Sequence, residues 1–151
     1  MTDLRQAVRD ATAVLSRAGI ASAASDAVVL AGHVLAVEPA EVRRWLVLGG
    51  REVPESYAAL VAERARRVPL QHLTGCAPFR RLSLAVGPGV FVPRPETEVL
   101  VDLALHEVDR LVSDDGADGR GGGLVGGGGI RLVDLCAGSG AIALAVKDER
   151  A

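Results

Sequence analysis

A run of very small side chains near residue 138 is the part of this sequence best suited to chemistry. It reads CAGSG at 136–140, after an apolar stretch at 130–135 and before helical character at 141–146. Side chains this small let a ligand approach the backbone closely, and a helix start presents N–H groups that lack partners inside the helix. The order of strand, glycine loop and helix predicts the opening of an α/β nucleotide-binding sheet.

The glycine loop alone fits several ligands: NAD, FAD, phosphate and S-adenosylmethionine. No Lys-Ser or Lys-Thr follows Gly140, which excludes the phosphate loop of nucleotide hydrolases. The spacing D-x-C-x-G-x-G from Asp134 also differs from the G-x-G-x-x-G of dinucleotide-binding enzymes. A tight strand-to-helix turn without any ligand is the alternative, because glycine also serves plain turns. Cys136 has no histidine near it in sequence to activate it, so a small buried position is expected for it.

A second candidate segment is PRPETE at 93–98. Its two prolines exclude a regular β-ladder, so a rigid loop that enters a helix is expected. That helix shows an apolar side made of Val99, Leu100, Leu103, Ala104 and Val108. The alternative is a stiff structural turn with a surface Arg-Glu pair.

The elements that must position these segments follow from hydrophobic periodicity. Helical spacing predicts a small bundle over the first seventy residues, with helices at 4–18, from about Ser25, from Pro39, and from Pro54 to Ala65. Thr2 is the predicted cap of the first helix. Period-two alternation at 82–86 predicts a half-buried strand, with 90–92 running back beside it. The glycine-rich stretch at 113–129 predicts a flexible linker.

Composition excludes several classes of protein. The chain has 151 residues, with 49% hydrophobic and 24% charged, which excludes a wholly disordered chain. Aromatic residues make up only 3%, and the net charge is −2, so direct nucleic-acid binding is not expected. No apolar run reaches the ~18 residues of a membrane span. Two cysteines and three histidines show no metal-ligand spacing, so no metal is proposed. With no secretory signal at the amino terminus, we expect the cytoplasm.

Three separated segments, in order along the chain, resemble one known family. They are RRVPLQHLTG at 66–75, GPGVFVPRPETE at 87–98 and DLCAGSGAIALA at 134–145, and the pattern AGI…SDA…HVL at 18–35 adds to them. The resemblance is to the HemK/PrmC glutamine N5-methyltransferases, which modify peptide chain release factors. It implies an α/β protein with an N-terminal helical bundle, a β-hairpin linker and the first strand-loop-helix of a Rossmann-like class I S-adenosylmethionine methyltransferase domain. The implied boundaries are 1–75 for the helical substrate-recognition domain, 76–93 for the linker, and 94–151 for an incomplete methyltransferase domain with its glycine-rich insert at 113–129.

The resemblance also implies the site. S-adenosylmethionine is the implied cofactor, and the residues implied to hold it are Asp134, Cys136, Ala137, Gly138, Ser139, Gly140, Thr97 and Glu98, with Arg94 in support. The family's catalytic loop, Asn-Pro-Pro-Tyr, does not occur in this sequence. We therefore expect the catalytic residues beyond the end of the chain, and no methyl transfer from these residues alone. Arg80-Arg81 stands where the family's hairpin commonly has an aromatic residue and a glycine.

The implied function is methylation of the glutamine in the GGQ motif of a release factor, and the implied partner is the GGQ-bearing domain. Two alternatives stay open. One is a non-catalytic module that binds release factor, and the other is a sister methyltransferase that acts on a ribosomal protein glutamine. The basic cluster at 64–67 admits two interpretations as well: a surface for acidic release factor or ribosomal RNA, or a solvated helix face.

Overall fold

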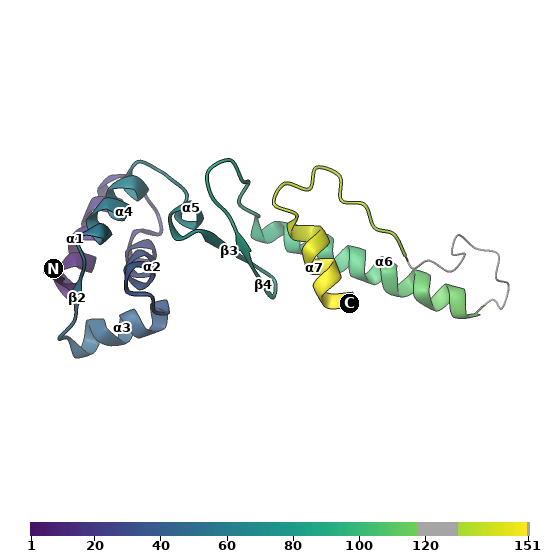
Figure 1. Cartoon of the computed structure of the whole chain (residues 1–151), viewed down its shortest axis with the longest axis horizontal. Helices are drawn as coiled ribbons and strands as arrows, with labels where there is room; N and C mark the ends of the chain where they lie inside the picture. Colours follow the sequence, from purple (N-terminus) through teal and green to yellow (C-terminus); the bar gives the residue numbers. More distant parts are fainter. Residues whose placement is uncertain (118–129, 151) are drawn as a thin grey trace. The chain divides into compact units, whose positions relative to one another are not determined.

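The computed structural model describes residues 1–117 and 130–150 of the chain. Within the chain two compact units are distinguished, Met1–Gly75 and Cys76–Ala151. The first unit is mostly helical, and the second combines a β-hairpin with the helices α6 (Glu98–Ala117) and α7 (Ala141–Arg150) (Figure 1).

The first unit is built from five helices and one short strand pair. The helices are α1 (Leu4–Arg17), α2 (Ala23–Leu35), α3 (Pro39–Leu48), α4 (Ser56–Ala65) and α5 (Leu70–Thr74). The helix α1 buries Leu4, Val8, Ala11 and Leu15, which recur at helical spacing. The predicted helices at the start of the chain are therefore confirmed, whereas α5 was not predicted.

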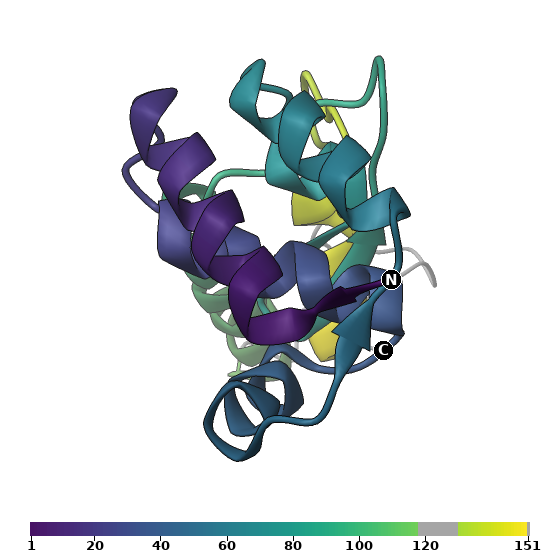
Figure 2. The same cartoon turned by 90° about the vertical axis from the view of Figure 1, so that its left-hand side faces the viewer.

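The predicted cap of α1 is wrong by one residue. The side chain of Asp3, not Thr2, accepts the hydrogen bond from the Gln6 N–H, at 3.0 Å. Thr2 instead belongs to β1 (Thr2–Asp3), which pairs antiparallel with β2 (Glu52–Val53) and places Thr2 opposite Val53. This pairing fixes the amino terminus beside the loop that leads into α4 (Figure 2).

Polar contacts inside the first unit join α2 to α4. The Tyr57 hydroxyl donates to the Ala27 carbonyl at 2.9 Å, and Arg64 Nε donates to Asp26 Oδ2 at 2.7 Å. Asp26 is only 4% exposed, so its charge is balanced by Arg64 within the core. The core around these contacts is aliphatic, with Leu15, Leu30 and Val42 fully buried.

The second unit opens with a hairpin. Strand β3 (Cys76–Phe79) pairs antiparallel with β4 (Leu82–Ala85), with Phe79 opposite Leu82. The strand predicted at 82–86 is therefore present, but its partner is 76–79 and not 90–92. The segment 90–92 precedes Pro93 and Pro95 and forms no strand, in keeping with the missing N–H of proline. A single 3₁₀ turn (Pro95–Thr97) then leads into α6 (Glu98–Ala117).

The buried side of α6 agrees only in part with the one predicted, because Ala104 packs against the core as expected and other residues of the predicted side do not. Val101 and Leu105 are buried with Phe79 and Leu84 of the hairpin, whereas Val99, Leu100 and Leu103 are more than half exposed. The sequence of α6 offers apolar residues on two sides. Val101 and Leu105, which are four residues apart and therefore lie on one face of the helix, are buried because that face packs against the hairpin. The helix also continues through Ala117, so residues 113–117 of the predicted linker are helical instead; the rest of that prediction, 118–129, lies outside the described residues.

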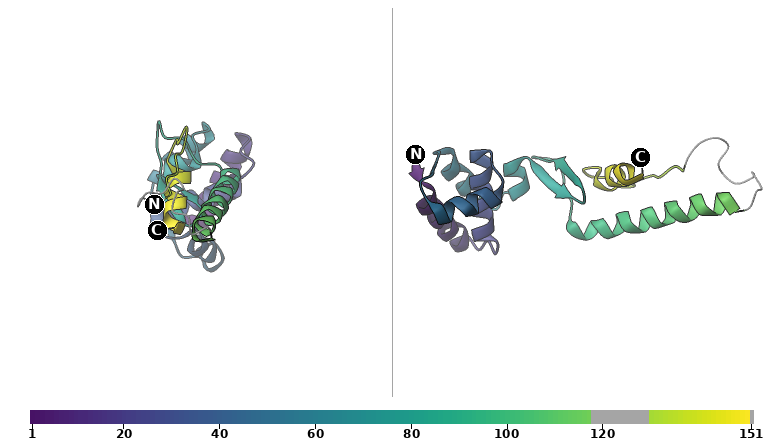
Figure 3. Two further views of the ribbon diagram at one scale, coloured as in Figure 1. Left: turned by 90° about the vertical axis from the view of Figure 1, so that its right-hand side faces the viewer. Right: turned by 90° about the horizontal axis from the view of Figure 1, so that it is seen from below.

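The helix α7 (Ala141–Arg150) lies beside α6, and its Ala141, Ala145 and Val146 join the same core (Figure 3). The strand predicted at 130–135 is not formed in the described structure. Ile130 to Asp134 carry no regular secondary structure, and Val133 and Leu135 are exposed. A parallel strand needs a hydrogen-bonding neighbour that is reached through a crossover, and the described residues supply none.

No single helix in the described part of the chain is long and apolar enough to cross a membrane. Taken together, α2 and α3 reach the required length and hydropathy, but the chain bends by 99° between the two helices.

Candidate functional site

The glycine loop at 136–140 makes a tight reversal that ends at the first turn of α7. Cys136, Gly138 and Gly140 all have positive φ, at 63°, 57° and 73°. The loop is closed by a hydrogen bond from the Gly140 N–H to the Ala137 carbonyl at 2.8 Å. Glycine adopts this backbone region without cost, but cysteine does so at a cost in free energy. A strained non-glycine residue at a loop of small side chains is typical of a functional site.

Asp134, at the entrance of the loop, carries an unsatisfied buried oxygen. Its Oδ2 atom is shielded from solvent and has no hydrogen-bond partner in the described structure. A buried polar atom without a partner costs about 1–3 kcal/mol. An acceptor held in this state is suited to a ligand that brings an N–H donor, such as the ammonium group of an amino acid. The first backbone amides of α7 lie at the other end of the same loop and suit a carboxylate.

The sequence predicts a small buried position for Cys136, and this prediction is wrong. Its side chain is exposed. Cys136 is not part of the buried cluster of this unit, which is built from the hairpin, α6 and α7. Ala137 and Gly138 are exposed as well, while Ser139 and Gly140 are partly buried. The loop is therefore an open cradle rather than part of the interior.

The signature segment at 93–98 reaches α6 through its 3₁₀ turn. The Thr97 N–H donates to the Arg94 carbonyl at 3.0 Å, which closes the turn. Thr97 and Glu98 are half-buried, and Arg94 is exposed. The carboxylate of Glu98 accepts a hydrogen bond from the Arg80 N–H in the hairpin turn, at 3.0 Å.

Phe91, which lies two residues before the signature segment, is a neighbour of the glycine loop. A Cβ atom placed on Gly138 would lie 3.9 Å from the Cβ of Phe91. Phe91 is 65% exposed, so its side chain is a partly free surface beside the loop. Phe91 was not among the predicted site residues. The signal in the sequence was an aromatic residue between Pro88 and Pro93, in a chain that is only 3% aromatic.

Arg80 organises the charge of the second unit. Its guanidinium contacts Glu149 through two hydrogen bonds, of 2.5 and 2.9 Å, and Asp102 through one of 2.6 Å. The hydrogen bonds that Arg80 donates to Glu149 and then to Asp102 raise the pKa of Arg80, and the hydrogen bond from Arg80 lowers the pKa of Glu149. A second pair, Arg150 with Asp109, also joins α7 to α6 and lowers the pKa of Asp109.

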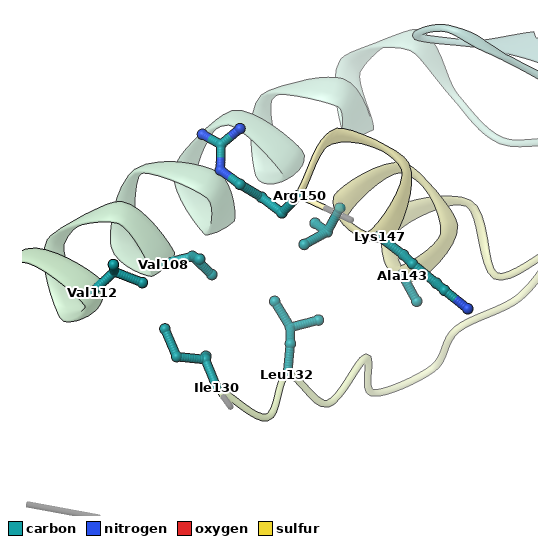
Figure 4. A pocket seen from close by; sticks show the side chains of 8 residues that line it. Val108, Val112, Ile130, Leu132, Ala143, Lys147 and Arg150 are labelled. Carbon is teal, nitrogen blue, oxygen red and sulfur yellow. The ribbon is translucent and has the colours of Figure 1, made fainter. Parts of the chain in front are cut away.

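One cavity beside α7 is mostly apolar, and no residue of the glycine loop lines it. It measures about 420 Å³ and lies between α6, the 130–132 segment and α7 (Figure 4). In Figure 4 Val108 and Val112 face Ile130 and Leu132 across it. Its polar lining comes from Lys147 and Arg150, and Arg150 is already paired with Asp109. None of the side chains that line this cavity carries a hydrogen-bond acceptor that could bind a cofactor.

In the helical unit, each arginine of the basic cluster has a protein partner. Arg64 binds Asp26 and the Val68 carbonyl, Arg66 binds Glu63, and Arg67 binds the Ala18 carbonyl. Arg64 is therefore a core residue rather than part of a surface for nucleic acid or acidic protein.

A different surface is open near the end of α3, where Val47 and Leu48 are exposed. Beside it a cavity of about 620 Å³ is lined in part by Trp45 and Arg51, whose guanidinium lies 4.5 Å from the indole centre.

Within the described residues, no group of three His, Cys, Asp or Glu side chains is placed to hold a metal ion.

Comparison with known proteins gives consistent results. Residues 6–75 match the family model described as the PrmC N-terminal domain. The chain is 46% identical to the release factor glutamine methyltransferase of Corynebacterium glutamicum, over 95% of this chain and 45% of that protein. It is 44% identical to the protein of the same name from Mycolicibacterium smegmatis, over 99% of this chain and 47% of that protein. For the Streptomyces coelicolor protein of that name the identity is 41%, over 94% and 44%.

The chain thus spans a little under half the length of the curated relatives it matches. The matched segments include the helical unit, the signature segment and the glycine loop, in the same order. The chain therefore belongs to the HemK/PrmC family, and its residues 6–75 form the PrmC N-terminal domain.

Proposed function

We propose that this chain supplies the substrate-recognition unit and the cofactor loop of an S-adenosylmethionine-dependent methyltransferase that acts on a release factor glutamine. The observation that carries the cofactor part is the unpartnered Oδ2 of Asp134 at the entrance of the glycine loop. The names of the relatives support the reaction and the substrate class. The proposed compartment is the cytoplasm, and the proposed fold around the loop is Rossmann-like.

The residues present fit the methionine part of this cofactor. Asp134 provides an acceptor for its ammonium group, and the first amides of α7 provide donors for its carboxylate. Cys136, Ala137, Gly138, Ser139 and Gly140 leave room for the ligand because their side chains are small. Thr97 and Glu98 are proposed to line the same pocket, with Arg94 in support. When bound, S-adenosylmethionine supplies a methyl group activated by a sulfonium.

Methyl transfer of this kind depends mainly on placing the donor and the accepting nitrogen in line. The task of this chain's loop is to hold the donor in one orientation. The side chains that hold the substrate amide in the family's Asn-Pro-Pro-Tyr loop are not among residues 1–151. The proposed roles of this chain are thus donor binding and substrate recognition.

The cofactor proposal is tested by calorimetry of the chain with S-adenosylmethionine, S-adenosylhomocysteine and NAD. We expect binding of the first two and none of NAD. Asp134→Asn should weaken S-adenosylmethionine binding about ten- to hundredfold, because a charge-assisted hydrogen bond is lost. Asp148→Asn is the matched control, since Asp148 is an exposed carboxylate of the neighbouring α7. Uptake of NAD without affinity for S-adenosylmethionine would refute the proposal.

A second candidate is a non-catalytic module that binds the GGQ-bearing domain of a release factor. The exposed apolar pair Val47 and Leu48, beside the cavity at Trp45, favours it. Val47→Glu should abolish capture of that domain by the chain, whereas Val99→Glu, which alters an exposed valine of the other unit, should not. Capture that persists in Val47→Glu would exclude this surface. A sister enzyme for a ribosomal protein glutamine is separated by offering both substrates.

A further inference from the structure

Arg80 sits in the hairpin turn in a backbone conformation that arginine rarely adopts. Its φ is +52°, in the left-handed region. The neighbouring structure holds this conformation by a hydrogen bond from the Arg80 N–H to Glu98 Oε1, at 3.0 Å. Residues that surrounding structure holds in such strained conformations cluster at functional sites.

The side chain of Arg80 joins three elements that are distant in sequence. It forms a two-pronged contact with Glu149 at the end of α7, and single contacts with Asp102 and the Glu98 carbonyl at the start of α6. Its side chain is 17% exposed and that of Glu149 only 9%. A planar guanidinium that meets a carboxylate through two parallel hydrogen bonds fixes direction as well as distance. By contrast, the Arg110–Glu107 pair lies within the single helix α6.

These contacts fix the far end of α7, the helix into which the glycine loop leads. The loop ends at Gly140, and α7 begins at the next residue. Ala141 and Ala145 of α7 pack in one core with Val101 and Leu105 of α6. Ala141 and Ala145 are small and interlock little with α6, so the ion pairs at the far end of α7, Arg80–Glu149 and Arg150–Asp109, help to select one placement of the helix.

We propose that Arg80 is a positioning residue for the cofactor loop: by tying the end of α7 to the start of α6, it holds residues 136–140 in register with Thr97 and Glu98. This inference rests on the proposed function for its cofactor readout, but not for its effect on the loop. It gives the arginine at this position of the hairpin a task that the turn alone does not require.

The test compares Arg80→Ala, Arg80→Lys and Glu149→Gln with the control Arg81→Ala, which changes the exposed next residue of the same turn. Amide hydrogen exchange is measured in the cofactor-free chain, and S-adenosylmethionine affinity is measured by calorimetry. Arg80→Ala should raise exchange at 136–145 about tenfold and weaken binding on the order of ten- to hundredfold. For Arg80→Lys, both exchange and affinity should lie between those of the unmodified chain and those of Arg80→Ala, because lysine keeps the charge but cannot form two parallel hydrogen bonds.

Chemical rescue separates positioning from a general loss of folding. Added ethylguanidinium should restore protection of 136–145 in Arg80→Ala, and ethylammonium should not, because only the former can form the two parallel hydrogen bonds. Unchanged exchange in Arg80→Ala, or equal effects of Arg80→Ala and Arg81→Ala, would overturn the proposal. If the unmodified chain binds no S-adenosylmethionine, the cofactor part of the proposed function fails, while the exchange and rescue measurements still decide whether Arg80 orders the loop.

Discussion

Arg64 Nε lies 2.7 Å from Asp26 Oδ2 in the interior of the helical unit, and both side chains are largely shielded from water. Asp26 belongs to the first turn of α2, where the helix dipole favours a negative charge. The same guanidinium also donates to the Val68 carbonyl at 3.0 Å, at the turn after α4. One side chain therefore connects the start of α2 with the end of α4.

Replacing Arg64 should destabilise the helical unit strongly. Arg64→Ala leaves the Asp26 carboxylate buried without a partner, and breaking one side of a buried ion pair costs about 3–5 kcal/mol. The measurement is urea unfolding followed by the fluorescence of Trp45, the single tryptophan of the chain. Arg66→Ala, which removes an exposed pair with Glu63, is the control and should cost at most about 0.5 kcal/mol. Equal losses in the two variants would show that the buried pair has no special weight.

Tyr57 should make the helical unit sensitive to alkali. Burial raises the pKa of Tyr57 above its ordinary value of 10.0. Because the folded-state pKa is the higher one, the stabilisation is complete below pH 10.0 and is lost as the pH rises further. Tyrosinate absorbance of this single tyrosine should therefore rise only together with the unfolding signal of Trp45.

Tyr57→Phe tests the same contact at neutral pH. It removes the hydrogen bond to the Ala27 carbonyl and should cost about 1 kcal/mol. It should also remove the alkaline step from the unfolding curve. Ionisation of Tyr57 near pH 10.0 in the folded chain would contradict its burial.

The helices of the first unit were predictable because their apolar residues recur at one period. Gly19 marks where the first helix stops, and Pro39 and Pro54 mark where two later helices begin. The helix α5 was missed because it has only five residues, too few for a periodic pattern to show. In α6 the period was visible, but the sequence offers apolar residues on two sides. The prediction chose Val99, Leu100 and Leu103, but these residues are exposed because the hairpin packs against Val101 and Leu105 instead.

The candidate site was predictable as a segment and not as a set of contacts. Small residues at 136–140 indicate a loop that a ligand can approach, and the structure gives Cys136 and both glycines the positive φ that such a loop needs. The exposure of Cys136, the unpaired oxygen of Asp134 and the approach of Phe91 to Gly138 depend on tertiary packing. The ion pair of Arg80 with Glu149 joins residues far apart in sequence, which no local pattern reveals.

Acid should loosen the attachment of α7 to the hairpin turn and α6. The hydrogen bond from Arg80 lowers the pKa of Glu149 below its ordinary value of 4.5, and Arg81 and Arg150 act in the same direction. A depressed folded-state pKa means that the stabilisation is present above pH 4.5 and is lost as the pH falls through the lower value. Amide exchange of α7 measured along a pH series should show this loss. Glu149→Gln should show a loose α7 already at neutral pH, and an acid transition identical to that of the unmodified chain would count against the pair.

Gly32 tests how closely the turn between α2 and α3 is packed. In an ordinary helix Gly→Ala is stabilising by about 1 kcal/mol. Here an added Cβ would lie 2.7 Å from the Val37 carbonyl oxygen, closer than such contacts allow. Gly32→Ala should therefore destabilise the helical unit, by about 1–3 kcal/mol, because the turn must shift to admit the methyl group.

The control for this substitution lies in the same helix. Ser25 is exposed on α2, so Ser25→Ala carries the gain in helix propensity without any crowding. Urea unfolding followed at Trp45 should place Ser25→Ala at or slightly above the unmodified chain and Gly32→Ala below it. If Gly32→Ala is as stable as Ser25→Ala, the Val37 carbonyl does not lie against α2, and α3 must leave α2 by a wider turn than the one described.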